Sequence, residues 1–298
     1  MKELNLFSIR QVIDLTGVSE FTIRGWENRY QAITPQRTAK GRRLYSTDDL
    51  LKIKALKDLV DSGHQISTIA TLNYQELQEL LTKQHHQETS HHKNPAITSI
   101  LEHAEKFSWT KVEKVFHDQR KKLKNKDFIF KFILPLIKEI NTLVAFNQFS
   151  ISREHILSAM IKEELYCLKN AHSRKKSKSR LVFATAENEL HELGILLSST
   201  LANLCGKTNI YIGVNTPRQQ VADVCLRYEA THLVLSATNP NLQQDFLHFL
   251  HFLDKQLPKH ISFCLGGAVV MNLAVNLKRD FKIFSTIEEV NAYFETLK

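Results

Sequence analysis

Apolar residues recur with different spacings along the chain, and each spacing predicts its own type of structure. Between residues 96 and 171 they return at three- and four-residue steps, as in ITSILEHAEKFSWTKVEKVF, DFIFKFILPLIKEINTLVAF and SREHILSAMIKEELYCLKNA. This spacing predicts a bundle of about four helices. After residue 179 the β-rich runs RLVFA, NIYIGV, HLVLSA, ISFCLGG and FKIFS alternate with helical stretches. That alternation predicts a five-stranded, doubly wound parallel sheet, a flavodoxin-like α/β fold.

Polar stretches separate these segments. One of them, TKQHHQETSHHKNPA, is rich in histidine. It reads as a metal tract or a solvated linker, and the lack of a cysteine or carboxylate cluster favours the linker. A second, HSRKKSKSR, either touches nucleic acid or is a solvated interdomain loop. We therefore expect a first domain at 1–82, a linker at 83–95, a helical bundle at 96–171, a basic connector at 172–179 and an α/β domain at 180–298.

Composition narrows the class of protein. A net charge of +9 over 298 residues points to a polyanionic partner if the basic residues cluster. No stretch approaches the roughly 20 apolar residues of a membrane span, and the opening MKELNLFSIRQ lacks a signal-peptide core. We expect a cytoplasmic protein with no membrane partner. The cysteines, Cys167, Cys205, Cys225 and Cys264, form no CxxC pair, so buried reduced thiols are expected rather than disulfides or a zinc site.

The first segment carries the elements of a winged helix-turn-helix. Ser8 can cap a helix over IRQVIDL, Gly17 permits a turn, and Ser19 can cap a second helix over EFTIRGWENRY. Two short helices joined in this way place the second helix in a major groove. The stretch RTAKGRRLYS then has the pattern of a basic β-hairpin, and STDD matches a capping box before LLKIKALKDLV. From Arg24 to Arg43 six basic residues stand against one acid, which suits a phosphate backbone.

This segment resembles the winged-helix domain of MerR-family transcriptional regulators, most specifically in TIRGWENRY and GRRLYSTDDL. The resemblance implies dimers on a palindromic double-stranded DNA operator and distortion of the DNA between half-sites. Trp26 is expected in the core. The helix after the wing, NYQELQELLTKQ, is shorter than the dimerisation helix of typical members, so self-association must come from other segments. The implied residues of the recognition helix and wing are Thr22, Arg24, Tyr30, Arg37, Lys40, Arg42, Arg43 and Tyr45.

A histidine stands between two carboxylates in ELHELG, directly after the first predicted strand of the sheet. From the residues alone, His191 can be a surface residue, a general base or a metal ligand. Ligands of a doubly wound sheet bind at the carboxyl ends of its strands, which is where His191 is expected. Glu189 can accept one imidazole N–H, fixing the tautomer and making the other nitrogen a stronger ligand.

Two later strand ends, LSAT and CLGG, complete a pattern with this loop. Together they resemble the DxHxxG, SxL and GG signature of cobalamin-binding domains, with Glu189 in place of the aspartate and Thr238 in place of the leucine. The resemblance implies that His191 is the lower ligand of the cobalt, and that small residues leave room for the nucleotide tail of the cofactor. The implied cofactor-binding residues are Glu189, His191, Gly194, Ser236, Thr238, Gly266 and Gly267.

The order of the three segments resembles the CarH/LitR group of regulators. That resemblance implies adenosylcobalamin between bundle and α/β domain, assembly into DNA-binding oligomers, and their disassembly by light. The group carries a Trp, then nine further residues, then Glu-His; Glu154 and His155 match, but Val144 stands at the Trp position. Phe146 or Phe149 are the available replacements for that indole. Cobalamin binding is therefore expected more firmly than adenosyl selectivity or light sensing.

Two functional interpretations remain. In the first, the protein is a transcriptional repressor whose homo-oligomerisation, as a dimer or tetramer, responds to cobalamin, with RNA polymerase or an anti-repressor protein as a further partner. In the second, the C-terminal part has lost the cofactor and serves as a protein-interaction module. A cobalamin-dependent methyltransferase or mutase is disfavoured, because the chain shows no catalytic module and carries a DNA-binding head.

Overall fold

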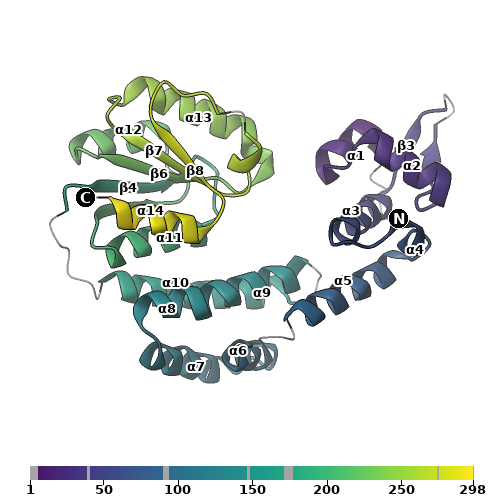
Figure 1. The fold of residues 1–298 in the computed structure, drawn as a ribbon, viewed down its shortest axis with the longest axis horizontal. Coiled ribbons are helices and arrows are strands. Elements are labelled where there is room, and N and C mark those ends of the chain that lie inside the picture. The colour runs from purple at the N-terminus through teal and green to yellow at the C-terminus, as the bar shows by residue number, and fades with distance from the viewer. Residues whose placement is uncertain are drawn as a thin grey trace. The chain divides into compact units, whose positions relative to one another are not determined.

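The computed structural model describes residues 6–38, 41–89, 94–145, 148–170, 177–273 and 275–297. The chain forms two compact units, residues 1–94 and residues 95–298, and Figure 1 labels their elements. No helix among the described residues is long and apolar enough to cross a membrane.

The first unit begins with the predicted pair of short helices, α1 (Ile9–Thr16) and α2 (Glu20–Tyr30). Ser8 and Ser19 cap them as predicted, the first in a capping box with Gln11. Gly17 ends α1 with a φ of 68°, a left-handed conformation that favours glycine. Trp26 lies in the core, with 7% of its surface exposed.

A small antiparallel sheet forms the wing. Its strands β1 (Phe7–Ser8), β2 (Gln36–Arg37) and β3 (Arg43–Tyr45) lie in the order β1-β3-β2. The hairpin between β2 and β3 closes through Thr38, whose N–H donates to the Arg42 carbonyl at 2.9 Å. The basic hairpin was predicted. The additional strand β1 was not, because two residues are too few to show an alternating pattern.

Three helices complete this unit: α3 (Thr47–Asp61), α4 (Ile66–Ile69) and α5 (Tyr74–Thr89). Ser46 and Asp49 form the predicted capping box at the start of α3. Helix α5 continues to Thr89, so the first residues of the predicted linker are helical. The sequence did not predict this continuation, because a run of polar residues shows no apolar period.

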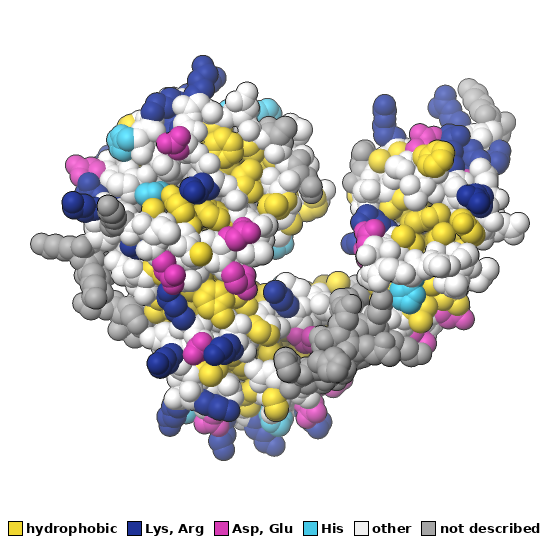
Figure 2. Space-filling view, viewed as in Figure 1, with side chains coloured by type: hydrophobic (Ala, Val, Ile, Leu, Met, Phe, Trp, Pro, Cys, Tyr) yellow, Lys and Arg dark blue, Asp and Glu magenta, His cyan; other side chains and the backbone are white. Residues whose placement is uncertain are grey.

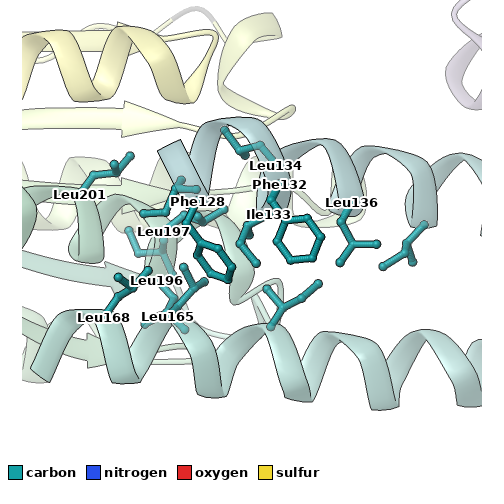
Figure 3. Packing of buried hydrophobic residues seen from close by; sticks show 14 of the residues in the cluster. Phe128, Phe132, Ile133, Leu134, Leu136, Leu165, Leu168, Leu196, Leu197 and Leu201 are labelled. Atoms are coloured by element: carbon teal, nitrogen blue, oxygen red, sulfur yellow. The ribbon is translucent and has the colours of Figure 1, made fainter. Parts of the chain in front are cut away.

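The second unit starts with the bundle, which has the predicted four helical stretches. These are α6 (Pro95–Glu105), α7 (Trp109–Lys122), a third helix from α8 (Asn125–Phe128) through the π-helical turn η1 (Ile129–Ile133) to α9 (Leu134–Ala145), and α10 (Ile151–Asn170). Figure 3 shows Phe128, Leu165 and Leu196 from three different helices in one interior. The bundle and the α/β domain therefore share one core.

The parallel sheet follows with β4 (Arg180–Thr185), β5 (Thr208–Gly213), β6 (His232–Ser236), β7 (Ser262–Gly266) and β8 (Phe281–Phe284). Their order, β5-β4-β6-β7-β8, confirms the predicted flavodoxin-like doubly wound sheet. Helices α11 (Leu193–Leu204) and α14 (Ile287–Thr296) cover the face toward the bundle, and α12 (Arg218–Arg227) and α13 (Gln243–Gln256) cover the other (Figure 1). The short turns η2 (Pro240–Leu242) and η3 (Val270–Asn272) follow β6 and β7.

The prediction of four buried thiols is wrong for one cysteine and partly wrong for a second. Cys225 and Cys264 are buried, and burial raises the pKa of each thiol to about 12. Cys205 is half-buried and Cys167 is exposed. On α10 the buried stripe runs through Leu165 and Leu168, which turns residue 167 to the outer face.

The ends of β6 and β7 lie so close together that one of them requires glycine. The Ala237 N–H donates to the Gly266 carbonyl at 3.0 Å, and the Val269 N–H donates to the Ala237 carbonyl at 3.1 Å. Gly267 has a φ of 99°, and a Cβ on it would overlap the backbone of Ala237. A Cβ on Gly266 would lie 3.8 Å from the Phe284 carbonyl oxygen, an ordinary contact.

We expect Gly267→Ala to lower the free energy of unfolding by about 2–4 kcal/mol, from backbone strain and overlap together. Gly266→Ala is the matched control and should cost less than about 1 kcal/mol. Denaturant unfolding of the full chain measures both. Equal stabilities of the two variants would contradict the close approach of the two strand ends.

Candidate functional site

The loop between β4 and α11 carries His191 at the carboxyl edge of the sheet, as predicted. The imidazole side chain is 59% exposed, whereas the Glu189 side chain is 2% exposed. Glu189 Oε1 lies 2.5 Å from Nδ1 of His191 and also accepts the His191 backbone N–H at 3.0 Å. The histidine is thus held by a buried carboxylate while its ring faces outward.

The second oxygen of Glu189 binds the loop that follows β6. Oε2 accepts the backbone N–H groups of Thr238 at 2.7 Å and Asn239 at 2.9 Å. Burial alone would raise the pKa of Glu189, but the N–H groups of Asn239, His191 and Thr238 and the imidazole outweigh it, so this pKa lies below its usual value. An ionised carboxylate can only accept. The proton of a neutral His191 ring therefore lies on Nδ1, and the Nε2 lone pair is free for a metal.

The remaining predicted residues of this site surround the same edge. A Cβ added to Gly194, at the start of α11, would lie 3.9 Å from Oγ of Ser236 at the end of β6. Gly266 and Gly267 follow at the end of the neighbouring strand β7. Positions 194, 266 and 267 therefore add no side chain to this edge, and at Gly267 the place of a Cβ is taken by the backbone of Ala237.

The second carboxylate of ELHELG, Glu192, was not predicted to have a role, and it binds the loop to the bundle. Its Oε2 lies 3.0 Å from Nζ of Lys162, and Oε1 accepts the hydroxyls of Tyr166 at 3.2 Å and Tyr211 at 3.1 Å. Burial alone would raise the pKa of Glu192, but these donors, with the charge of Lys162, hold it below its usual value. The partners come from α10 and β5, so no local pattern could reveal them.

Glu154 and His155 form a second carboxylate–imidazole pair, near the start of α10. Nδ1 of His155 lies 2.6 Å from Oε2 of Glu154, and the other oxygen, Oε1, accepts the Ser158 hydroxyl at 2.5 Å. His155 precedes Lys162 by two turns, about 10 Å along the helix, and residues two turns apart share a face. Lys162 contacts Glu192, and the Lys169 carbonyl, further along α10, accepts from Asn203 near the end of α11. The first turns of α10 therefore extend beyond the start of α11, at the end of the unit that carries His191.

Val144 lies in the last turn of α9 and is half-buried, packed against the shared core. Phe146 and Phe149 were the two candidates to take the place of the missing indole. Phe149 is a core residue with 7% of its surface exposed. Phe149 is therefore corrected from a candidate cap to a packing residue. Phe146 lies outside the described residues.

The first unit presents a basic surface around α2 and the wing (Figure 2). Arg37 and Arg42 are exposed on the hairpin, and Arg24 on α2 pairs with Glu20 at 2.5 Å with half of its side chain exposed. The Thr22 hydroxyl lies 2.8 Å from that of Ser19, within the helix cap. Tyr30 is half-exposed, with the Arg29 guanidinium 5.8 Å from its ring. Lys40 lies outside the described residues.

Two predicted contact residues are instead held by a buried carboxylate. Tyr45 is fully buried, and its hydroxyl donates to Glu27 on α2; burial raises the Tyr45 pKa, so the hydroxyl keeps its proton. Arg43 places Nε 2.9 Å from the other oxygen of Glu27, with 23% of its side chain exposed. Tyr45 is thus corrected from a DNA contact to a core residue. Successive side chains of a strand point to opposite faces, and in β3 the face of Tyr45 is the inner one. The sequence suggested a surface position for Tyr45 because its side chain carries a polar hydroxyl.

Comparison with known proteins agrees with this organisation. The family model of MerR HTH family regulatory proteins matches residues 7–76. The HTH-type transcriptional repressor CarH of Myxococcus xanthus is 25% identical over 266 residues, which cover 88% of this chain and 89% of that protein. This likeness agrees with the prediction of a regulator rather than an enzyme.

The second unit has a known fold. The monomethylamine corrinoid protein of Methanosarcina barkeri aligns with a TM-score of 0.54 and 16% identity, over 68% of this chain and 99% of that one. An identity this low shows the common fold alone, a helical bundle followed by a doubly wound sheet.

A further relative shows the family to which the chain belongs. The HTH-type transcriptional regulator GlnR of Bacillus anthracis is 32% identical over 114 residues, which cover 38% of this chain and 76% of that protein. Together with the family model over residues 7–76 and the capped helices, turn and wing of the first unit, this likeness identifies the family. The chain belongs to the MerR family of helix-turn-helix regulatory proteins.

Proposed function

We propose that this protein is a DNA-binding transcriptional repressor whose C-terminal unit binds cobalamin through His191, and whose self-association and operator binding respond to that cofactor. The observation that carries the proposal is the Glu189–His191 pair at a glycine-lined sheet edge, in the same chain as a MerR-type winged helix. The relative named as a repressor, CarH, supports the direction of regulation.

The chain's residues fit the cofactor in three respects. Glu189 orients His191 with Nε2 outward, Gly194 places no side chain between α11 and the end of β6, and Ser236 offers a hydroxyl there. Bound cobalamin would supply a cobalt ion with an exchangeable upper ligand. The first turns of α10, with Glu154 and His155, are the part of the bundle that extends past the start of α11, at the end of the unit that carries His191.

The proposal also includes regulation by self-association of the protein and by light. Glu192 binds the histidine loop to α10, so a ligand that moves this loop also moves the bundle. A bundle surface altered in this way is a route to a dimer or tetramer, and hence to cooperative binding at an operator. A response to light would require that the protein binds a form of the cofactor whose upper ligand is removed by light, such as the adenosyl form. We also propose RNA polymerase or an anti-repressor protein as a further partner of the regulator.

The wing gives a test of DNA binding. Arg42→Ala should weaken binding to an operator selected from random duplexes and reduce the slope of log affinity against log salt by about 0.9, because one phosphate contact is lost. Arg43→Ala should act differently: it leaves the buried Glu27 without its cation and should lower the free energy of unfolding by about 1–3 kcal/mol. Fluorescence anisotropy across salt concentrations and thermal unfolding measure the two effects. An unchanged salt slope for Arg42→Ala would show that this part of the wing does not contact the DNA phosphates.

His191 gives a test of cobalamin binding. His191→Ala should lose the base-off, histidine-ligated absorption spectrum and most of its affinity for hydroxocobalamin. The fold should survive, because the imidazole is largely exposed, and the loss of one donor to buried Glu189 should lower the free energy of unfolding by about 1 kcal/mol. Glu189→Gln should weaken binding roughly 10- to 100-fold, because it removes the carboxylate that orients the ring. His248→Ala, an exposed histidine on α13, is the matched control.

Tight cobalamin binding by His191→Ala would show that the lower-ligand assignment is wrong. A wild-type protein that binds its operator but takes up no cobalamin would instead favour the second interpretation, in which the α/β unit is a protein-interaction module.

Val144 gives a test of selectivity for the upper ligand. An indole covering an adenosyl group would bury something like 100 Å² of apolar surface, on the order of 2–3 kcal/mol before entropy and strain are subtracted. This corresponds to about one to two powers of ten in affinity. We therefore expect wild type to discriminate weakly between adenosyl- and methylcobalamin, and Val144→Trp to prefer the adenosyl form. Titrations of both proteins in the dark measure this. A strong adenosyl preference in wild type would contradict it, and would make light sensing the favoured form of regulation.

A further inference from the structure

An exposed aromatic ring stands on the helix that reads DNA in proteins of this architecture. Phe21 lies in the first turn of α2 and has 89% of its surface exposed, the largest fraction among the large hydrophobic side chains that the structure describes. The first residues of a recognition helix are those that reach base edges. A single exposed apolar residue is not by itself evidence of a site, so a second feature is needed.

Gly25, in the middle of the same helix, is that second feature. Its backbone does not adopt a positive φ, and a Cβ built on it would meet nothing within 4 Å. Neither the backbone conformation nor internal packing requires glycine here, and glycine destabilises a helix relative to alanine. The space above Gly25 is therefore of use only to something outside the chain.

Phe21 and Gly25 lie one turn apart on one face of α2, opposite the buried Ile23, Trp26 and Glu27. Helical side chains lean toward the N-terminus, so a larger side chain at 25 would extend toward Phe21. We call the empty position above Gly25, where a Cβ would meet no atom within 4 Å, the notch; Arg24 and Asn28 are exposed beside it on the same helix.

The surroundings indicate what fills this notch. Exposed arginines stand on α2 and on the wing of the same unit, among them Arg24, Arg37 and Arg42, so the partner is a polyanion rather than an apolar protein surface. Among the groups that a DNA major groove presents, the 5-methyl group of thymine is apolar, and Phe is one of the side chains that contact it.

We propose that Phe21 and Gly25 together read thymine: the ring packs against the 5-methyl group, and the missing side chain at 25 lets the base edge approach the helix. The proposal rests on the DNA binding proposed above and adds a base preference to it. It also predicts that these two residues act on affinity through bases and not through phosphates.

The test removes the methyl group from the DNA and the ring from the protein. An operator is first selected from random duplexes with the full-length protein, and each thymine is then replaced singly by deoxyuridine, which lacks the 5-methyl group. Wild type should lose about fourfold in affinity at one or more positions of each half-site, the fold-change of about 0.8 kcal/mol for one buried methyl. Phe21→Ala should bind less tightly overall and show no loss at those positions. Its salt slope should equal that of wild type.

Gly25→Ala provides a variant that cannot fail by unfolding. Its midpoint of thermal unfolding should equal or exceed that of wild type, because alanine is the better helix former. Its affinity for the selected operator should nevertheless fall about tenfold or more. Leu15→Ala, which removes another exposed apolar side chain of the same unit (54% exposed), is the control and should leave the deoxyuridine effect as in wild type.

The outcomes separate the two proposals. Equal deoxyuridine losses in wild type and Phe21→Ala, or full affinity of Gly25→Ala, would overturn the thymine contact while DNA binding stands. A protein that selects no duplex at all would overturn the proposed function itself. A loss of affinity in Phe21→Ala that is the same for every sequence would assign the ring to the sugar–phosphate backbone and also overturn base reading.

Discussion

The buried carboxylate of Glu189 is the interaction on which the rest of the candidate cobalamin site depends. A buried charge is tolerated only when several donors replace its water shell. Here the donors are the backbone N–H and ring nitrogen of His191 and the N–H groups of Thr238 and Asn239. Meeting that requirement draws together the loops after β4 and β6. The direction of the imidazole is a consequence of the same requirement.

Two other carboxylates play the same part elsewhere in the chain. Glu192 collects Lys162, Tyr166 and Tyr211 and so joins the histidine loop to the bundle. Glu27 collects Tyr45 and Arg43 and so fixes the recognition helix α2 against the wing strand β3. In each case an acidic residue within a candidate functional segment holds two elements of the fold together. These carboxylates fix the relative positions of the elements, whereas the candidate contact residues beside them are exposed.

The difference between buried residues that hold elements together and exposed residues explains why some predicted roles were wrong. Arg43 and Tyr45 look like surface residues in a basic hairpin, yet both face Glu27. Phe21, to which the sequence assigned no role, is an apolar residue on the exposed face of α2, opposite the buried Ile23, Trp26 and Glu27. Phe149 looked like a free aromatic and belongs to the core. Residue type misleads in all these cases, and the face of the element decides.

Features that depend on local order along the chain could be predicted from the amino-acid sequence. Apolar periods, capping residues and turn glycines predicted the paired helices and hairpin of the first unit, the four helical stretches and the five strands, because these signals act between near neighbours. The histidine loop and the glycines at the strand ends were visible for the same reason. The folded structure was needed to show which side chains meet across elements, such as Glu192 with Lys162 or Glu27 with Tyr45. It also decided that Gly267 must be glycine, since that follows from the neighbouring strand end at Ala237. Contacts between distant residues leave no period in a single sequence.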